Sequence, residues 1–461
     1  MQLDDRLRSS LAAASCGLLG MAPAAVNADS TDPLQMDSAL LYYTEKDRVN
    51  VTELAAIVTQ TLGEDETVSV SPTIDAITGA SPTGATSTDK TQTFGANDTA
   101  APNSLPLKHF SDRRYAVAIS WQQPLDRLTK SVLGADVSIE HDYNSIGANA
   151  SVARDFNNKL TTLSAGISGS FDSVQPAGGI VPQGLTPLNS AFTTAAPAPA
   201  SDFEHLFDDR LTTAIPHAVT SASGVVIGGG STGTSEVLNS SKARQSRDKQ
   251  VIDGIIGLTQ VFNRRTLMQF NYGLGLSNGY LTDPYKIISM VDGSSGETVD
   301  YITELRPDTR LRQALYWKTV LHLPEDVIHL SYRYFRDDWG IRSHTVDLHY
   351  RFELGSGFYL EPQARYYSQT AADFYHHSLM DGAPLPNYAS ADYRLAAMSS
   401  YTYGLKFAVP LGKAGEFNAR ATYMQQTGDS HPADAIGVQR SQDLYPGLEA
   451  MTLQLGLSLK L

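Results

Sequence analysis

The sequence contains very little cysteine and few basic residues. Its 461 residues include one cysteine, Cys16, which excludes a framework of disulfide bonds and a cluster of thiolate metal ligands. Lys and Arg together number 35 against 49 Asp and Glu, so the net charge is -14. A chain this acidic is not expected to have nucleic acid as its main partner.

Long apolar runs are also missing. A membrane-spanning helix needs about 20 consecutive apolar residues, and only the N-terminal segment comes near that length. There, Arg6 and Arg8 precede a run of apolar and small residues that ends in Val-Asn-Ala at 26–28. This pattern predicts a signal peptide over residues 1–28, with a short amphipathic helix of the mature protein as the alternative. Any membrane span within residues 29–461 must then be formed by β-strands.

Strict alternation of apolar and polar residues is what the sequence does contain. Every second residue is apolar from Val346 to Leu354, and the alternation resumes from Phe358 to Tyr366 after Gly-Ser-Gly at 355–357. A period of two predicts two β-strands joined by a tight turn. Similar runs approach the ~9–11 residues of a membrane-spanning strand, longer than the ~5–6 typical of soluble proteins. They cover residues 68–75, 115–122, 133–140, 268–277, 401–411 and 451–461.

The connections between these runs alternate in length. Tight turns are expected at 157–159, 263–265, 324–326, 355–357 and 412–415. The connections at the opposite end include tight hairpins near Asn144, near 337–340 and near the N-terminus. They also include every long segment rich in Gly, Pro, Ser, Thr and Ala: about 78–112, 175–247, 281–309, 376–397 and 428–447. Short periplasmic turns with longer extracellular loops are typical of outer-membrane barrels. A soluble all-β domain, the alternative, has no reason to sort its loops this way.

The strands therefore predict an all-β fold, a transmembrane antiparallel up-and-down β-barrel of about 16 strands. We expect residues 29–461 to form one barrel domain in the outer membrane of a Gram-negative bacterium. The count of 16 requires two strands before Val68, at 38–45 and 48–58. Leaving this hairpin out gives 14 strands.

The alternation also divides the side chains between lipid and lumen. Charges are very costly in hydrocarbon, so the apolar faces must contact lipid and the charged faces must line a lumen. Four of the basic residues lie between 310 and 370, which favours anions in the lumen. A charge-balanced wall without a transport role is the alternative. The predicted lumen-lining charges are Lys318, Arg333, Asp347, Arg351, Glu353, Glu361, Arg365, Lys406 and Arg420.

The turn at 355–357 predicts a register for its hairpin. If it closes the hairpin, Leu354 lies opposite Phe358. Opposite charges directly across a ladder contribute ~0.2–1 kcal/mol each. Counting back from the turn, the predicted pairs are Arg351 with Glu361 and Asp347 with Arg365.

No motif in the sequence specifies an active site. Residues 225–235 contain Gly-x-Gly-x-x-Gly, the pattern of dinucleotide-binding loops, but no amphipathic helix follows, so a flexible loop is expected. We predict no catalytic, cofactor-binding or metal-binding residue and no enzyme, with an outer-membrane hydrolase as the less favoured alternative. Three oxygen-rich groups lack the spacing of known calcium loops: Asp337 with Asp338; Asp373 with His376, His377 and Asp381; and Glu204 with His205, Asp208 and Asp209.

Four segments resemble a known family. "YRYFRDDWGIRSHTVDLHYRFE" (332–353) and "LEPQARYYSQTAADFY" (360–375), with "DRVNVTE" (47–53) and "DAITGASPTGA" (75–85), are similar to an uncharacterised family of bacterial outer-membrane β-barrels, domain of unknown function 3570. The resemblance spans essentially the whole mature chain. It implies a secreted Gram-negative barrel without an established activity. Relatives are encoded near a flavin-attaching transferase and a small lipoprotein, which implies an association with extracytoplasmic redox chemistry.

We expect the protein to be a channel or solute transporter with a charged lumen. The alternative is a non-conducting scaffold that docks a periplasmic partner, a redox protein or a lipoprotein. Other expected partners are outer-membrane lipid and the barrel insertion machinery. No cofactor is expected.

Overall fold

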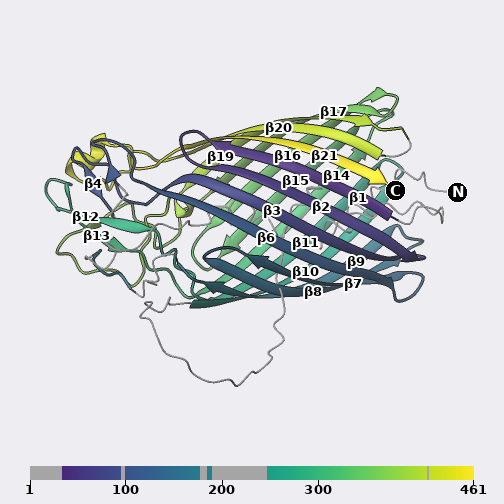
Figure 1. The fold of residues 1–461 in the computed structure, drawn as a ribbon, viewed down its shortest axis with the longest axis horizontal. Coiled ribbons are helices and arrows are strands. Elements are labelled where there is room, and N and C mark those ends of the chain that lie inside the picture. Colours follow the sequence, from purple (N-terminus) through teal and green to yellow (C-terminus); the bar gives the residue numbers. More distant parts are fainter. Residues whose placement is uncertain (1–33, 95–98, 177–183, 189–246, 413–414) are drawn as a thin grey trace, which may run out of the picture.

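Sixteen antiparallel strands close into one barrel in the computed structural model of the protein (Figure 1). The structure describes residues 34–94, 99–176, 184–188, 247–412 and 415–461. Strands that neighbour each other in the barrel follow one another along the chain, and β1 (Leu34–Glu45) pairs with β21 (Leu448–Lys460) to complete the ring. The predicted barrel of 16 strands is confirmed, including the N-terminal hairpin that a count of 14 omits.

The other barrel strands differ in length but share one connectivity. They are β2 (Asn50–Gly63), β3 (Glu66–Pro82), β6 (Leu107–Pro124), β7 (Thr129–Ile139), β8 (Tyr143–Phe156), β9 (Thr161–Val174), β10 (Arg247–Asn263), β11 (Thr266–Gly279), β14 (Thr309–His322), β15 (Val327–Asp337), β16 (Arg342–Gly355), β17 (Phe358–Gln369), β19 (Met398–Pro410) and β20 (Gly415–Gly428). Each has a hydrogen-bonded neighbour on both sides, so closure leaves no free edge. A wall in contact with hydrocarbon requires this, because its backbone groups have no water to bind.

The outer face of the barrel wall is apolar. On β16, Val346 and Leu348 are 40% and 41% exposed, whereas Asp347 between them is 4% exposed. The same alternation places Leu453 and Met451 of β21 on the outside. Polar side chains therefore occupy the interior, as the period of two in the sequence predicts.

The β16–β17 hairpin confirms the register predicted for both charge pairs and corrects its turn. Asp347 lies opposite Arg365, as predicted. Phe358 lies opposite Gly355, so its predicted pairing with Leu354 is wrong. Ser356 and Gly357 both have positive φ, as in a type I′ turn, and the ladder shifts between Glu353 and Gly355. Gly355 also has positive φ and absorbs this irregularity.

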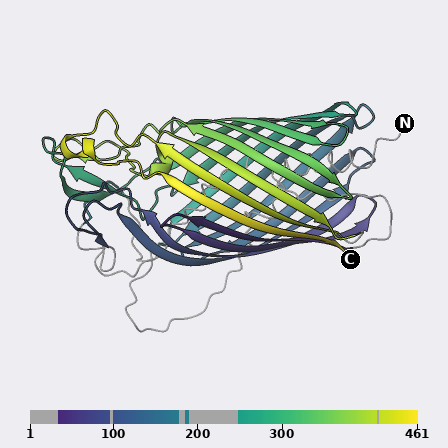
Figure 2. The same ribbon diagram turned by 90° about the horizontal axis from the view of Figure 1, so that it is seen from above.

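The two ends of the barrel differ in their connections (Figures 1 and 2). Where β1 begins and β21 ends, the turns are short, for example 64–65, 264–265 and 356–357. Most connections at the other end are long, and their described parts fold into a cap that extends beyond the strands. We call this cap the outer dome; it comprises residues 83–94, 99–106, 280–308, 370–397 and 429–447.

The outer dome has secondary structure of its own. β12 (Ile287–Val291) pairs with β13 (Thr298–Thr303) and with β18 (Leu379–Met380), so segments from two long connections form one sheet. Ile288 and Met290 pack in an apolar cluster beside this sheet. The short pair β4 (Gln92–Thr93) and β5 (Thr99–Ala100) and two 3-10 helices, η3 (Tyr393–Leu395) and η4 (Gly437–Ser441), complete it. No helix among the described residues is both long and apolar enough to cross a membrane.

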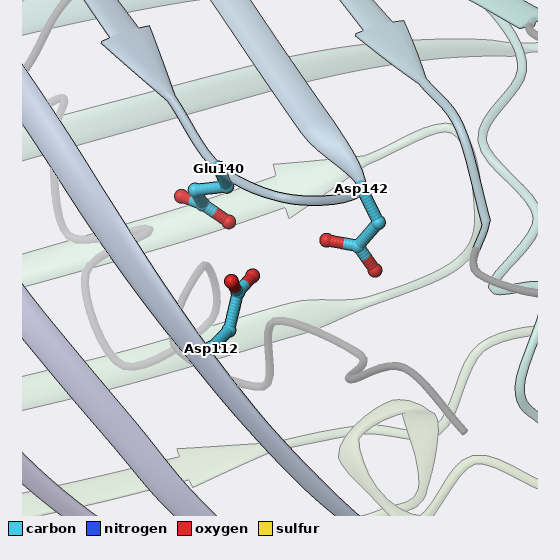
Figure 3. A group of neighbouring side chains, drawn as sticks. All are labelled: Asp112, Glu140 and Asp142. Carbon is cyan, nitrogen blue, oxygen red and sulfur yellow. The ribbon is translucent and has the colours of Figure 1, made fainter. Parts of the chain in front are cut away.

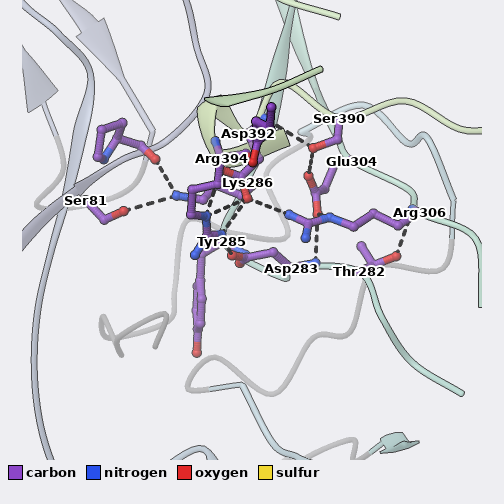
Figure 4. Close-up of polar contacts among 12 residues, drawn as sticks. Ser81, Thr282, Asp283, Tyr285, Lys286, Glu304, Arg306, Ser390, Asp392 and Arg394 are labelled. Carbon is purple, nitrogen blue, oxygen red and sulfur yellow. Dashed lines mark hydrogen bonds and ion pairs between the residues drawn. The ribbon is translucent and has the colours of Figure 1, made fainter. Parts of the chain in front are cut away.

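Buried charges join the connections of the outer dome (Figure 4). Asp392 accepts hydrogen bonds from Arg306 at 2.8 Å and from Arg394 at 2.5 Å, and Arg394 also reaches Asp283 at 2.8 Å. Lys286 donates to the carbonyl of Pro82 at 2.6 Å. Burial acts to raise the pKa of Asp392, but the charges of Arg394, Lys286 and Arg306 outweigh it and hold that pKa well below its usual value. Asp392 is therefore charged and fixes two connections to each other.

We expect Asp392→Ala to loosen the outer dome without opening the barrel. The change leaves Arg306 and Arg394 buried without their shared carboxylate, which costs about 3–5 kcal/mol in a buried ion pair. Limited trypsin digestion of the refolded variant should cleave the connections at 280–308 and 370–397 faster than in the parent, while the β-sheet circular dichroism stays the same. Asp381→Ala, which removes an exposed carboxylate from the same connection, is the matched control. Equal digestion rates for the parent and Asp392→Ala would contradict the role of this carboxylate.

Candidate functional site

The interior face of strands β14 to β20 carries the lumen-lining charges predicted from the sequence. Each alternates along its strand with residues of the apolar outer face. Arg333, Asp347 and Arg420 are buried within this interior. The positions are Lys318 on β14, Arg333 on β15, Asp347, Arg351 and Glu353 on β16, Glu361 and Arg365 on β17, Lys406 on β19 and Arg420 on β20.

His349 joins two of these charges and was not among the predicted residues. Its Nε2 lies 3.1 Å from Asp347 Oδ1, and its Nδ1 lies 3.1 Å from Glu361 Oε1. A carboxylate oxygen accepts hydrogen bonds, so the ring can satisfy both only by donating from both nitrogens. The geometry therefore holds His349 as an imidazolium, and it adds a positive charge that the sequence alone did not indicate.

A glycine lets this cluster extend across three strands. The guanidinium of Arg420 on β20 donates to Gln363 Oε1 and to Glu361 Oε1 on β17, each at 3.4 Å, although β19 lies between β20 and β17. Gly404 of β19 pairs with Gln363 on one side, and a Cβ added to it would meet Gln363 Oε1 at 3.1 Å. Gln363 in turn donates to Asp347 at 3.2 Å. The missing side chain of Gly404 thus leaves room for a polar chain from Arg420 to Asp347.

Near the short turns, the ladder pairs His349 with Gln363 and Phe352 with Leu360, so Arg351 lies opposite Glu361 as predicted, but its side chain contacts other residues. Its Nε donates to Glu353 Oε1 at 2.7 Å on its own strand, and its guanidinium lies 3.6 Å from the centre of the Tyr359 ring. Glu361 is instead bound by His349 and Arg420. Residues two apart on a strand share a face, and the aromatic ring gives the guanidinium a stacking surface. A cross-strand count does not capture either contact.

Interior charges fall into two arcs of the barrel wall, judged from their alternation with the exposed apolar side chains. Among the described residues, the arc of β14–β20 is mainly basic: Arg310, Arg312, Lys318, Arg333, Arg351, Arg365, Lys406 and Arg420, against Asp337, Asp347, Glu353, Glu361 and Glu416. The arc of β1–β11 is mainly acidic: Asp37, Glu45, Glu53, Asp75, Asp112, Asp136, Asp155, Asp172 and Asp253, against Lys108, Arg114, Lys130, Arg247 and Lys249. In a closed barrel these two arcs face each other across the interior.

Three carboxylates converge at the dome end of the acidic arc (Figure 3). One oxygen each of Asp112, Glu140 and Asp142 lies within 4.8 Å of the others. The side chain of Asp142 accepts a hydrogen bond from Tyr285 at 2.9 Å. Burial, with added repulsion from Asp112, raises the pKa of Glu140 to about 8 and that of Asp142 to about 7. Clustered oxygen ligands suit a divalent cation such as calcium, and protonation is the other way to relieve their repulsion.

This acidic group was not predicted, although the strand register contains it. Tyr115 lies opposite Ile139 in the β6–β7 ladder, so continuing the count brings Asp112 to Asp142. The sequence showed Glu140 only as a polar position on its strand. The sequence assigned no register to the β6–β7 hairpin, and that register would have revealed the acidic group.

Two of the oxygen-rich groups seen in the sequence contact residues of other segments. Asp337 is bound by Arg310 at 2.7 Å. His377 lies 4.0 Å from Asp434, a residue of another connection. Residues 204–209 and the glycine-rich segment 225–235 lie outside the described residues.

The closed 16-strand wall with its apolar exterior and charged interior defines an outer-membrane-type β-barrel. Residues 8–459 match the model of the family described as "Protein of unknown function (DUF3570)". The chain therefore belongs to that family, and the resemblance seen in the sequence is confirmed. No curated protein matches the sequence.

Several solved structures are similar to the chain in fold. A bacterial polysaccharide outer membrane secretin is 7% identical with a TM-score of 0.43, over 94% of this chain and 100% of that chain. A mutant of the ferric enterobactin receptor PfeA from Pseudomonas aeruginosa is 8% identical with a TM-score of 0.40, and the match covers 92% of this chain and 59% of that chain. OccK5 (OpdH) from Pseudomonas aeruginosa is 8% identical with a TM-score of 0.38, and the match covers 93% of this chain and 97% of that chain. At these identities the likeness concerns the fold alone.

We expect Glu140 to make the stability of the barrel depend on pH. Its pKa of about 8 in the folded protein lies above the ordinary glutamate pKa of 4.5, so the folded state holds the proton more tightly than the unfolded chain. Stability should therefore fall as the pH rises from about 4.5 to about 8. Melting temperatures measured across this range should fall less in Glu140→Gln than in the parent.

Glu64→Gln is the control for this measurement, because Glu64 is an exposed carboxylate in the short β2–β3 turn. It should keep the pH dependence of the parent. An unchanged slope in Glu140→Gln would show that the acidic group does not titrate as its burial implies.

Proposed function

We propose that the protein is a channel in the outer membrane of a Gram-negative bacterium, and that small polar solutes pass between its two charged arcs. The separation of interior charge between β14–β20 and β1–β11 carries this proposal. A structural wall needs only local pairing of charges. Sorting them into opposite arcs adds an electric field across the interior, which low-dielectric walls focus.

Such a field acts on solutes in two ways. Anions follow the basic arc and cations the acidic arc, so side chains on either arc tune selectivity. A solute with separated charges or a strong dipole is oriented across the lumen. Near the short turns, the side chains of Arg351 and Glu416 are about one third exposed, 33% and 35% respectively, which leaves them accessible to a passing solute.

A non-conducting scaffold for a periplasmic lipoprotein or redox partner is the second candidate. The polar chain of Asp347, Gln363 and Arg420 favours it, because these buried groups satisfy one another and need no passing ion. A barrel whose interior is closed by such contacts provides a rigid docking surface for a periplasmic partner.

Single-channel recording in a planar bilayer under a salt gradient tests the channel directly. We expect discrete conductance steps. Lys406→Gln on the basic arc should shift the reversal potential toward cation preference, and Asp155→Asn on the acidic arc should shift it toward anion preference. A single wall charge changes the local ion concentration on the order of a few-fold.

Lys90→Gln removes a charge from an exposed side chain of the outer dome and should leave the reversal potential unchanged. A silent bilayer from protein that is inserted and folded would reject the channel in favour of the scaffold. Equal shifts in the same direction for both wall variants would reject the two-arc account of selectivity.

A further inference from the structure

Two amides in the barrel wall have hydrogen-bonding atoms without partners. Gln269 on β11 has no exposed area, and within the described part of the chain neither its Oε1 nor its Nε2 has a hydrogen-bond partner. Asn271, the next residue on the same face, is 5% exposed, and its Oδ1 also has no partner there. Leaving such buried atoms unpaired costs stability. Unsatisfied buried groups in native proteins therefore require an explanation.

A lysine lies beside these amides. Lys318 on β14 stands directly opposite Gln269 in the ladder. Among the described residues its ammonium forms no hydrogen bond and has no carboxylate within ion-pair distance. The carboxylates whose charges act on it, Asp347 and Glu361, are both bound by His349. The positive charge of Lys318 is therefore available to a ligand.

We infer that Gln269, Asn271 and Lys318 form a binding site for a small carboxylate that also carries a hydroxyl or amino group. Lys318 pairs with one carboxylate oxygen, and Nε2 of Gln269 donates to the other. A hydroxyl of the ligand donates to one of the two amide oxygens, Gln269 Oε1 or Asn271 Oδ1, and an amino group can donate to both. A plain anion would use the lysine but leave both amide oxygens unpartnered.

The site is closed in this structure, because Gln269 has no exposed area. The ligand must displace a neighbouring side chain to reach it. Lys318 is suited to move, since its four-carbon stem is flexible and no ion pair holds its ammonium. The site rests on the proposed function in one respect, since a solute reaches it through the lumen.

Titration calorimetry of the purified, refolded barrel with lactate and propionate tests this site. The two probes differ by one hydroxyl. We expect lactate to bind about tenfold or more tightly than propionate, because propionate leaves a buried acceptor without a donor. Lys318→Met should abolish the binding of both.

Gln269→Leu separates a binding role from a structural one. It should reduce the affinity for lactate to that for propionate and should also raise the melting temperature, because leucine removes the unpaired amide. A purely structural glutamine would lower the melting temperature when replaced. Lys159→Met, in the exposed β8–β9 turn, is the control lysine variant and should bind lactate like the parent.

Three results would overturn the site: no lactate binding to the folded parent, equal affinities for lactate and propionate, or unchanged binding in Lys318→Met. Calorimetry does not require a conducting barrel, so its outcome is independent of the bilayer recording. Conductance without lactate binding would reject the site and keep the channel. Lactate binding without conductance would keep the site and reject the channel.

Discussion

Closure of the strands behind an apolar outer face is the constraint on which the other features depend. Because each strand has a neighbour on both sides, the backbone is satisfied within the wall, and the outside can be almost wholly apolar. Polar side chains then have only the interior and the outer dome to occupy. The charged side chains of this acidic chain therefore lie close together in these two regions. How they pair with one another determines what each region can bind.

Within that interior, neighbouring strands do not set the pairing alone. His349 is held between carboxylates of β16 and β17, and Arg420 of β20 reaches past Gly404 to β17 as well. These contacts satisfy part of the basic arc and leave Lys318 beside two unpaired amides. In the outer dome, where Asp392 binds two arginines, the buried charges are paired directly. The outer dome and the barrel interior thus contain similar charged residues with different roles. In the dome, paired charges hold the connections together, and in the interior the charge of Lys318, unpaired among the described residues, is available to bind a ligand.

Much of the fold could be predicted from the sequence because period two is a local signal. It predicts the strands, their count and the Asp347–Arg365 pair. The contacts of the His349 side chain, the contacts of the Arg351 side chain and the acidic group at Asp112 could not be predicted from it. The first two depend on how far side chains reach along and across strands, and the third depends on the register of the β6–β7 hairpin, which the sequence did not assign. The outer dome was beyond prediction for a similar reason, since its sheet joins connections far apart in the chain.

Anomalous diffraction from crystals of the barrel soaked in bromide would test the two-arc interior most directly. Bromide reports where the interior holds anions, whether or not the barrel conducts. We predict ordered bromide beside basic side chains of β14–β20, including Lys318, and none along β1–β11. Bromide spread equally over both arcs, or an interior that admits none, would contradict the account.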